Sequence, residues 1–283
     1  MTSRLLDGRA AAEAVRGEVT QAIAARVAAG LPAPGLATVL AGDDPASAWY
    51  VGSIGRQAKR AGIAWRDVRV DPRAGDPALR AALHELNADD AVHGVIVMLP
   101  LPEPLTSATV AEQLDPEKDV DGITSTSMGR LALGVDGLTP CTPAGGMELL
   151  KRNGVPLMGA EAVVVGRSAI VGKPLALMLL AEHATVTLCH TRTRDLAAVC
   201  RRADVLCAAV GKPGLITAQM VKPGATVVDF GTTPGEGDKL VGDVDPGVAE
   251  VAGILAAIPG GTEQVTTAIL LRNTLRAAER LGR

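Results

Sequence analysis

The chain has 283 residues, 47% of them hydrophobic, which is enough for two domains with a sizeable core. Its formal net charge of −3 offers no broad basic field, so neither nucleic acid nor an anionic membrane is predicted as a partner. The four cysteines form no C-x-x-C pair and the four histidines lack metal-ligand spacing, so we expect neither a disulfide framework nor a metal site.

The N-terminal sequence M-T-S-R-L-L-D-G-R-A contains no apolar signal region, and every stretch of membrane-span length is interrupted by Gly, Pro or charge. We therefore expect a cytoplasmic protein with reduced cysteines. Aromatic residues make up only 1% of the chain, so the core must consist of Val, Leu, Ile and Ala. Tyr50, the single tyrosine, stands out against this background.

The first part of the chain alternates between apolar, β-branched runs and helical patterns. The predicted elements are helices over 8–28, 46–61, 76–87 and 106–114, and strands over 36–41, 64–70 and 92–99. Asp7 and the pair Asp44-Pro45 are typical of helix starts. The resulting β-α-β-α-β order predicts an α/β domain with a parallel sheet.

Residues 115–142 are rich in Asp, Gly, Thr and Pro, and a helix over 143–153 follows them. The second part then repeats the alternation, with strands over 162–165, 185–190, 204–210 and 226–230 and helices over 173–182, 195–202 and 217–221. This pattern predicts a doubly wound sheet. Apolar runs at 240–244 and 254–255 precede a final long helix over 265–281.

These elements predict an α/β fold of two domains. The first, over 1–142, is a parallel-sheet domain, and the second, over 143–264, is a Rossmann-like doubly wound domain. A long C-terminal helix commonly packs back across an earlier domain, so residues 265–283 are expected to return to the first domain.

A possible phosphate site lies in the segment E-A-V-V-V-G-R-S-A-I-V-G-K-P over 161–174. A strand that ends at Gly166, a second glycine at Gly172 and a helix start form a layout in which backbone N–H groups approach a phosphate. Arg167 supplies a cation for an extra phosphate, and Ser168 supplies a hydroxyl donor. A tight turn that binds nothing explains the same residues equally well, because the pattern is not G-x-G-x-x-G.

The next strand favours NADP over NAD as the cofactor. An NAD site usually has an acidic residue at the end of this strand, whereas this chain continues with Thr191, Arg192, Thr193 and Arg194. Hydroxyl and guanidinium groups bind a 2′-phosphate that a carboxylate would repel. A solvated basic loop is the competing interpretation, especially for Arg194.

The chain also resembles the methylenetetrahydrofolate dehydrogenase/cyclohydrolase family along nearly its whole length. The motifs that carry the resemblance are G-D-D-P-A-S-A-W-Y-V at 42–51, L-P-L-P at 99–102, D-P-E-K-D-V-D-G at 115–122, G-R-L at 129–131, P-C-T-P at 140–143, V-G-R-S-x-I-V-G-K-P at 165–174, A-V-G-K-P-G at 209–214, V-G-D-V at 241–244 and P-G-G at 259–261. The resemblance implies two α/β domains, a folate between them and NADP on the second, and typically a homodimer formed through the cofactor domain.

The resemblance implies oxidation of 5,10-methylenetetrahydrofolate with NADP and, in bifunctional members, hydrolysis of the methenyl product to 10-formyltetrahydrofolate. It assigns the catalytic and folate contacts to Tyr50, which would stack on the ring system, and to Asp121, which would bond the pterin amino edge. Without it, a core ring and a turn-capping carboxylate would be the simpler interpretations. The other implied contacts are Leu99, Pro259, Gly260 and Gly261 for the folate, and Gly166, Arg167, Ser168, Thr191, Arg192 and Thr232 for NADP.

Three positions depart from the family pattern. The expected acid/base lysine, four residues after the tyrosine, is Ile54, and the glutamine that partners it is Met98. After P-G-G, Thr262-Glu263-Gln264 stands where the family usually continues V-G-P, so that Glu263 would bring a carboxylate close to the pocket. We therefore predict an NADP-dependent dehydrogenase with weak or absent cyclohydrolase activity. The alternative is a divergent paralogue that binds NADP and a folate but acts on another one-carbon substrate or is non-catalytic.

Overall fold

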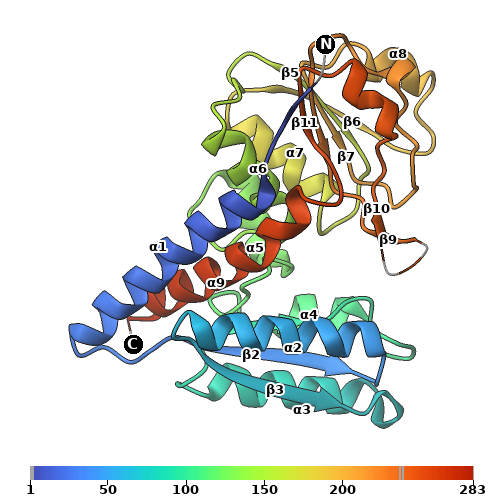
Figure 1. Cartoon of the computed structure of the whole chain (residues 1–283). Helices are drawn as coiled ribbons and strands as arrows, with labels where there is room; N and C mark the ends of the chain where they lie inside the picture. Colours follow the sequence, from blue (N-terminus) through green and yellow to red (C-terminus); the bar gives the residue numbers. More distant parts are fainter. Residues whose placement is uncertain (1–2, 236, 238, 283) are drawn as a thin grey trace. The chain divides into compact units, whose positions relative to one another are not determined.

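The computed structural model describes residues 3–235, 237 and 239–282, and the chain divides into two compact units (Figure 1). Unit 1 comprises Met1–Glu13 and Thr142–Ile269, and unit 2 comprises Ala14–Cys141 and Leu270–Arg283. The predicted 1–142 domain therefore loses its first segment to the other unit. The physical reason is strand pairing, because β1 (Arg4–Leu5) lies parallel to β11 (Ile254–Ala256) in unit 1.

Unit 2 contains a three-stranded parallel sheet in the order β3-β2-β4. Its strands are β2 (Gly35–Ala41), β3 (Ala64–Val70) and β4 (Gly94–Val97). Helix α2 (Pro45–Arg60) covers one face of the sheet and α3 (Gly75–Ala88) covers the other (Figure 1). Every residue of β2 is buried, as expected for a central parallel strand covered on both faces.

Local capping explains where the helices of unit 2 begin. Asp44 Oδ2 accepts a hydrogen bond of 2.8 Å from Ser47 N at the start of α2. Thr106 caps α4 (Ser107–Gln113) in the same way. Thr124 caps α5 (Ser125–Leu133), which the sequence analysis did not predict because its segment is rich in turn-forming residues.

Three long helices contain residues of both units: α1 (Gly8–Ala28), α6 (Cys141–Arg152) and α9 (Thr262–Leu281). The end of α9 belongs to unit 2, where Asn273 Nδ2 donates bonds of 2.9 Å to the carbonyl oxygens of Val120 and Thr139. The predicted return of the final helix is confirmed, although the transition falls at residue 270 and not at 265.

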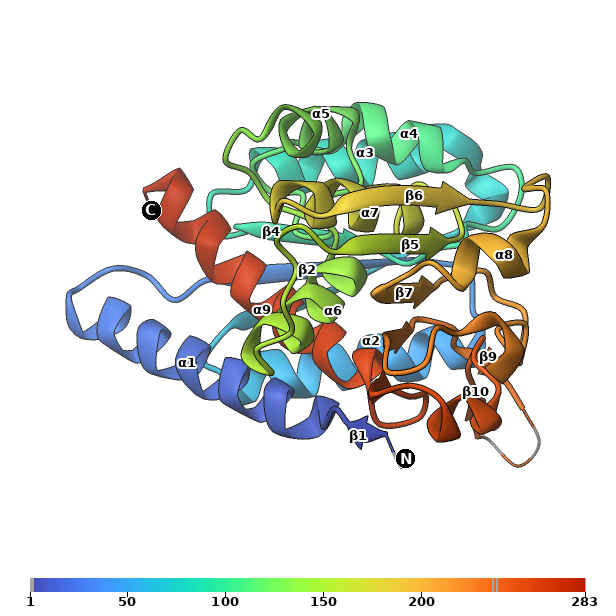
Figure 2. The ribbon, with the colours of Figure 1, turned by 90° about the horizontal axis from the view of Figure 1, so that it is seen from above.

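Unit 1 contains a six-stranded parallel sheet in the order β1-β11-β8-β7-β5-β6. Its remaining strands are β5 (Glu161–Val165), β6 (Thr185–Cys189), β7 (Val205–Ala208) and β8 (Thr226–Asp229), and Figure 2 shows β6, β5 and β7 side by side. Buried apolar side chains of these strands form one core cluster. The predicted α/β, Rossmann-like fold is confirmed.

The connections of unit 1 are shorter than predicted. Helix α7 (Gly172–Ala181) matches its prediction, but α8 covers only Leu196–Cys200, and the helix expected over 217–221 is a 3-10 turn at Ala218–Met220. A second 3-10 turn covers Pro246–Glu250. Within the apolar run at 240–244, Leu240–Val241 form strand β10, which pairs antiparallel with β9 (Thr233–Pro234).

All four cysteines are free and buried. Within residues 3–235, 237 and 239–282, the structure contains no group of three or more His, Cys, Asp or Glu side chains that could hold a metal ion. Over the same residues, each helix is too short or too polar to cross a membrane.

Candidate functional site

In the turn after β5, the backbone at Gly166 lies close to the backbone at Ala209 and at Gly172. Gly166 has φ +123°, and a Cβ there would collide with the carbonyl oxygen of Ala209. A Cβ at Gly172, the first residue of α7, would collide with the carbonyl oxygen of Gly166. Both glycines are therefore required by the geometry of a strand–turn–helix connection.

Ser168 closes this turn. Its Oγ accepts hydrogen bonds from Val171 N at 3.2 Å and Gly172 N at 3.3 Å, ahead of α7. A hydroxyl that accepts two bonds still has its own hydrogen to donate. The side chains of Arg167 and Ser168 are exposed, so both can reach a ligand at the N-terminus of α7.

The turn after β6 lies at the same edge of the sheet, because Val165 and Cys189 are paired at the ends of β5 and β6. Thr193 Oγ1 accepts a bond of 2.8 Å from His190 N, and His190 Nδ1 accepts one of 3.1 Å from Arg192 N. The side chains of Thr191 and Arg192 are left exposed. The structure thus brings Gly166, Arg167, Ser168, Thr191 and Arg192 to one sheet edge.

Thr232 lies near the same edge, since it is exposed and follows β8. Strand β5 has β6 on one side and β7 on the other, so the direction of winding reverses beside it. Ligands of open α/β sheets bind at the carboxyl ends of the strands at such a switch point. The arrangement suits a dinucleotide phosphate.

Two buried carboxylates, which the sequence analysis did not single out, position the loops at this edge. Asp243 is fully buried, and its Oδ2 accepts from Val210 N at 2.6 Å and Gly211 N at 3.0 Å. Its Oδ1 accepts from Lys212 N at 2.7 Å. Asp243 therefore holds the A-V-G-K-P-G loop that leaves β7.

Asp229 in turn holds the segment that carries Asp243. Its Oδ1 accepts from Asp243 N at 3.0 Å and its Oδ2 from Val244 N at 3.0 Å. A Cβ at Gly242 would collide with the Asp229 carboxylate, and one at Gly231 would collide with the Asp243 backbone. Burial raises the pKa of Asp229 to about 6, and the Asp243 charge adds to the rise.

In unit 2, helix α2 presents two different faces. Val51, Ile54 and Ala58 are fully buried, and Ile54 therefore belongs to the core-facing stripe. Tyr50 is half-buried on the neighbouring stripe of the helix. The position where the family resemblance expects a lysine thus holds a fully buried aliphatic side chain.

The D-P-E-K-D-V-D-G motif is an anchored turn. The Nζ of the buried Lys118 donates bonds of 2.8–2.9 Å to the carbonyl oxygens of Leu86, Asn87 and Asp89 at the end of α3. A cation at a helix C-terminus is also favoured by the helix dipole. The buried Asp119 carboxylate accepts from Ile123 N, Thr124 N and Ser127 Oγ, which ties the turn to α5.

Asp121 ends this anchored segment and is only partly buried. Its Oδ1 accepts a bond of 3.2 Å from Cys141 N in the P-C-T-P motif. Gly122 has φ +61°, and a Cβ there would collide with Thr139 and Pro140. The two motifs therefore pack together and fix the Asp121 carboxylate by one oxygen.

Burial raises the pKa of Asp121 to about 6, with a contribution from the Asp119 charge, so its carboxyl takes up a proton at a higher pH than an ordinary aspartate. If Asp121 accepts from the amino edge of the folate, as the family resemblance implies, a protonated Asp121 would instead present a donor to that amino group. We expect kcat/KM for the folate to fall about tenfold from pH 7 to pH 5, with an inflection near pH 6.

A pH profile of the Asp121→Asn variant is the control. The inflection in kcat/KM for the folate should disappear, while the profile for the dinucleotide, which reports on unit 1 and Asp229, should keep its shape. An unchanged folate inflection in Asp121→Asn would contradict the assignment.

The L-P-L-P motif follows β4, which ends at Val97 and not at residue 99 as predicted. Met98 and Leu99 are half-buried, and Met98 N donates a bond of 2.9 Å to Val39 O. The Leu99–Pro100 peptide bond is cis. Residues of this motif and of the G-D-D-P turn at 42–45 line one pocket of about 420 Å³.

Pro259, Gly260 and Gly261 belong to unit 1, whereas Tyr50, Leu99 and Asp121 belong to unit 2. The structure also shows what Glu263 does. Its two carboxylate oxygens accept bonds from Gly260 N at 2.5 Å and Gly261 N at 3.0 Å, so it caps the start of α9. Gln264 Nε2 donates to the same carboxylate at 3.0 Å.

The fold and the edge of the sheet in unit 1 define a two-domain α/β protein of the dinucleotide-binding class. Residues 6–121 match the domain family "Tetrahydrofolate dehydrogenase/cyclohydrolase, catalytic domain". Residues 140–281 match the domain family "Tetrahydrofolate dehydrogenase/cyclohydrolase, NAD(P)-binding domain". The chain belongs to the tetrahydrofolate dehydrogenase/cyclohydrolase family.

Proteins of this family resemble the chain over nearly its full length. The chain is 50% identical over 280 residues to "Bifunctional protein FolD" of Roseiflexus sp. (strain RS-1), covering 99% of this chain and 97% of the relative. A crystal structure of the bifunctional enzyme FolD from Campylobacter jejuni superposes with a TM-score of 0.95 at 38% identity, covering 99% of both chains. The Trypanosoma brucei enzyme, solved with NADP cofactor and inhibitor, gives 0.94 at 35% identity, covering 100% of this chain and 99% of that one.

Proposed function

We propose that this protein oxidises 5,10-methylenetetrahydrofolate to the methenyl form with NADP, and that its cyclohydrolase step is weak or absent. The observation that carries the proposal is the contrast between two sites. The turn after β5 in unit 1, which we call the phosphate turn, has the two close-packed glycines Gly166 and Gly172 and the exposed side chains of Arg167 and Ser168. In unit 2, the fully buried Ile54 occupies the position of the family's acid/base lysine.

The two reactions make different demands on the protein. Hydride transfer requires the methylene carbon to be held against the nicotinamide, with nitrogen lone pairs assisting, and no enzyme base has to take a proton. Hydrolysis of the methenyl cation requires proton transfers to and from water and the ring nitrogens. Neither Ile54 nor Met98 can supply them, so the loss should affect only the second reaction.

The test supplies purified protein with NADP and 5,10-methylenetetrahydrofolate and follows NADPH formation and methenyl decay separately. We expect NADPH to form and the methenyl product to accumulate, decaying at its spontaneous rate. Enzymatic methenyl decay above that rate would refute the loss of the cyclohydrolase step. Binding of both ligands without NADPH formation would favour the alternative, a divergent paralogue for another one-carbon substrate or for binding alone.

The choice of NADP is supported by what surrounds the end of β6. Thr191 and Arg192 are exposed there. The first acidic residue, Asp195, is used elsewhere, because its Oδ1 accepts a bond of 3.1 Å from Ala198 N and caps α8. Asp195 is therefore not free to repel a 2′-phosphate at the turn after β6. The Trypanosoma brucei relative was solved with NADP.

Replacing Arg192 with alanine should raise KM for NADP about 10- to 100-fold, because charge-assisted bonds to the 2′-phosphate are lost. KM for NAD, which lacks that phosphate, should change little. Steady-state kinetics with both dinucleotides measures the effect, and Arg194→Ala serves as the matched control for an exposed arginine of the same loop. Equal losses with NADP and NAD would contradict the assignment.

We further propose that the protein is a cytoplasmic homodimer, as the family resemblance implies. Analytical ultracentrifugation at several protein concentrations tests the assembly. A monomer at all concentrations would contradict it.

A further inference from the structure

The C-terminal helix α9 contributes a buried side-chain amide to unit 2. Asn273 is only 1% exposed, and its Nδ2 donates hydrogen bonds of 2.9 Å to the carbonyl oxygens of Val120 and Thr139. Both hydrogens of the amide are therefore used on backbone carbonyl groups. The same nitrogen also contacts Cys141 Sγ at 3.6 Å.

The two carbonyl groups that Asn273 holds belong to the two segments that meet at Asp121. Val120 directly precedes Asp121 in the chain. Thr139 lies two residues before Cys141, whose N–H donates a bond of 3.2 Å to Asp121 Oδ1. Cys141 Sγ donates a further bond of 3.2 Å to the Val120 carbonyl oxygen. One amide thus fixes both the backbone that carries the Asp121 carboxylate and the backbone that binds it.

The segment before Asp121 is also held from the side of the sheet. Val95 N in β4 donates a bond of 2.7 Å to the carbonyl oxygen of Lys118. Val120 itself is completely buried. The backbone is therefore fixed by the sheet at Lys118 and by Asn273 at Val120. Asp121 is the next residue, so a displacement of the Val120 carbonyl group would be passed directly to it.

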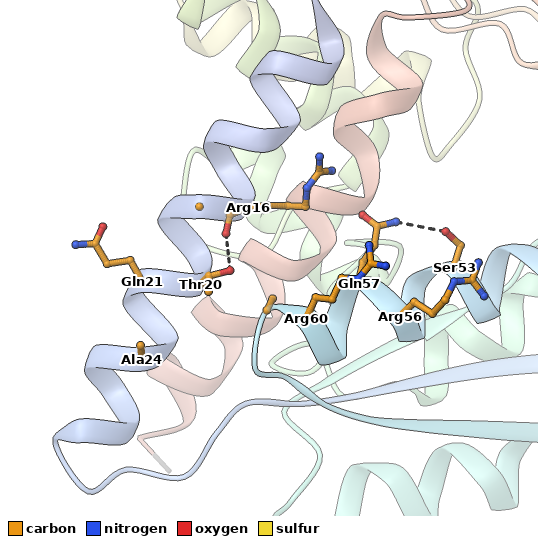
Figure 3. Close-up of a pocket in the computed structure, with 10 residues that line it drawn as sticks. Arg16, Thr20, Gln21, Ala24, Ser53, Arg56, Gln57 and Arg60 are labelled. Atoms are coloured by element: carbon orange, nitrogen blue, oxygen red, sulfur yellow. Dashed lines mark hydrogen bonds between the residues drawn. The ribbon is translucent and has the colours of Figure 1, made fainter.

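An amide that serves only its own helix is different. Figure 3 shows Gln57 of α2 in the groove between α1 and α2, where its Nε2 donates to Ser53 Oγ at 3.4 Å. That bond joins two residues one helical turn apart. The bonds of Asn273 join residues 153 and 134 positions apart, so they hold the tertiary arrangement around Asp121 and not the helix.

We propose that Asn273 is a positioning residue of the folate site, whose amide sets the direction in which the Asp121 carboxylate faces the substrate. This inference rests on the proposed function, in which a folate is the substrate and Asp121 is one of its contacts. A misplacement of about 1 Å can cost about 100-fold in rate, so a residue that does not touch the substrate can still control how well it binds and reacts.

The experiment is a double-mutant cycle between Asn273 and Asp121, measured as KM for 5,10-methylenetetrahydrofolate. We expect Asn273→Ala to raise this KM about tenfold and to leave KM for NADP within about twofold of the wild-type value. In the Asp121→Asn background, the same substitution should change KM for the folate by less than about twofold, because no carboxylate is left to position. Additive effects would overturn the proposal, since they would show that Asn273 acts independently of Asp121.

The pH profile separates positioning from a general loss of structure. Burial raises the pKa of Asp121 to about 6, and the ionisable groups beside it are Cys141 and Asp119. Asn273→Ala should admit water to this turn, so that burial penalises the charged carboxylate less. The inflection in kcat/KM for the folate should then move about one pH unit lower. An inflection that stays near pH 6 in a variant with a raised KM would contradict the proposal.

Thr274→Val is the matched control at the next position of α9. Thr274 is fully buried, and the bond of 2.8 Å from its Oγ1 to the Leu270 carbonyl oxygen stays within the helix. The substitution should leave both KM values and the inflection unchanged. Where Asn273→Ala fails to fold, Asn273→Ser, which keeps one donor, enters the same cycle, and a wild-type KM for the folate in that variant would overturn the proposal.

The positioning role and the proposed function can fail separately. If no NADPH forms, the proposed function fails, and isothermal titration of the folate into the four proteins of the cycle still measures the coupling. Non-additive affinities support the positioning role even then. Additive affinities overturn it whether or not the folate is oxidised, as does an Asp121→Asn variant that binds the folate as tightly as the wild-type protein.

Discussion

The double variant Ile54→Lys/Met98→Gln is expected to hydrolyse methenyltetrahydrofolate about 10²-fold faster than the unchanged protein, since a general acid/base contributes roughly 10²–10⁴ to such a step. The amine would enter α2 on the stripe that Val51 and Ala58 share. Burial lowers the pKa of a lysine toward neutrality, which suits proton transfer in both directions. The glutamine supplies the partner that the family resemblance pairs with this lysine.

The same substitution carries a cost in stability. Ile54 is completely buried, so a lysine there gives up solvation that a single amide only partly replaces. We expect the free energy of unfolding to fall by about 2–4 kcal/mol, measured by urea denaturation. The dehydrogenase rate should persist, because hydride transfer does not use the amine.

Ile54→Leu is the matched control, because it conserves volume and apolar character. It should leave both the dehydrogenase rate and the spontaneous methenyl decay unchanged. A folded, NADPH-forming double variant that hydrolyses no faster than Ile54→Leu would show that the missing lysine and glutamine do not explain the lost step.

Most of the fold could be predicted because the signals are local. The apolar run of β2 and the Asp44-Pro45 start of α2 lie within a few residues of the elements that they define. The errors occur where distant pairing decides. Residues Arg4–Leu5 form a strand only because β11 is available beside them, and no local pattern shows this.

The candidate site divides in the same way. The glycines of the phosphate turn are visible in the sequence because close backbone packing excludes every other residue at those positions. The role of Glu263 could not be predicted from the sequence, because a carboxylate near a pocket and a carboxylate that caps its own turn look alike in sequence. The burial of Ile54 was equally hidden, because the face of a helix that becomes the core depends on what packs against it.

Asp243 is the clearest case of a residue whose importance only the structure shows. We expect Asp243→Asn to lower the free energy of unfolding by about 3 kcal/mol, because at least one of the three N–H donors at 210–212 that the buried Asp243 carboxylate now accepts from would face an NH2 group. KM for NADP should also rise about tenfold, because the loosened loop includes Ala209, which packs against Gly166.

Asp245→Asn is the matched control two residues along the chain. Asp245 Oδ1 accepts a single bond of 2.8 Å from Gly247 N at the start of a 3-10 turn, so its loss should cost only about 1 kcal/mol and leave KM for NADP unchanged. Urea denaturation and steady-state kinetics on both variants test the contrast. Equal effects of the two substitutions would mean that Asp243 is an ordinary cap, and that the loop beside Gly166 holds its position without a buried carboxylate.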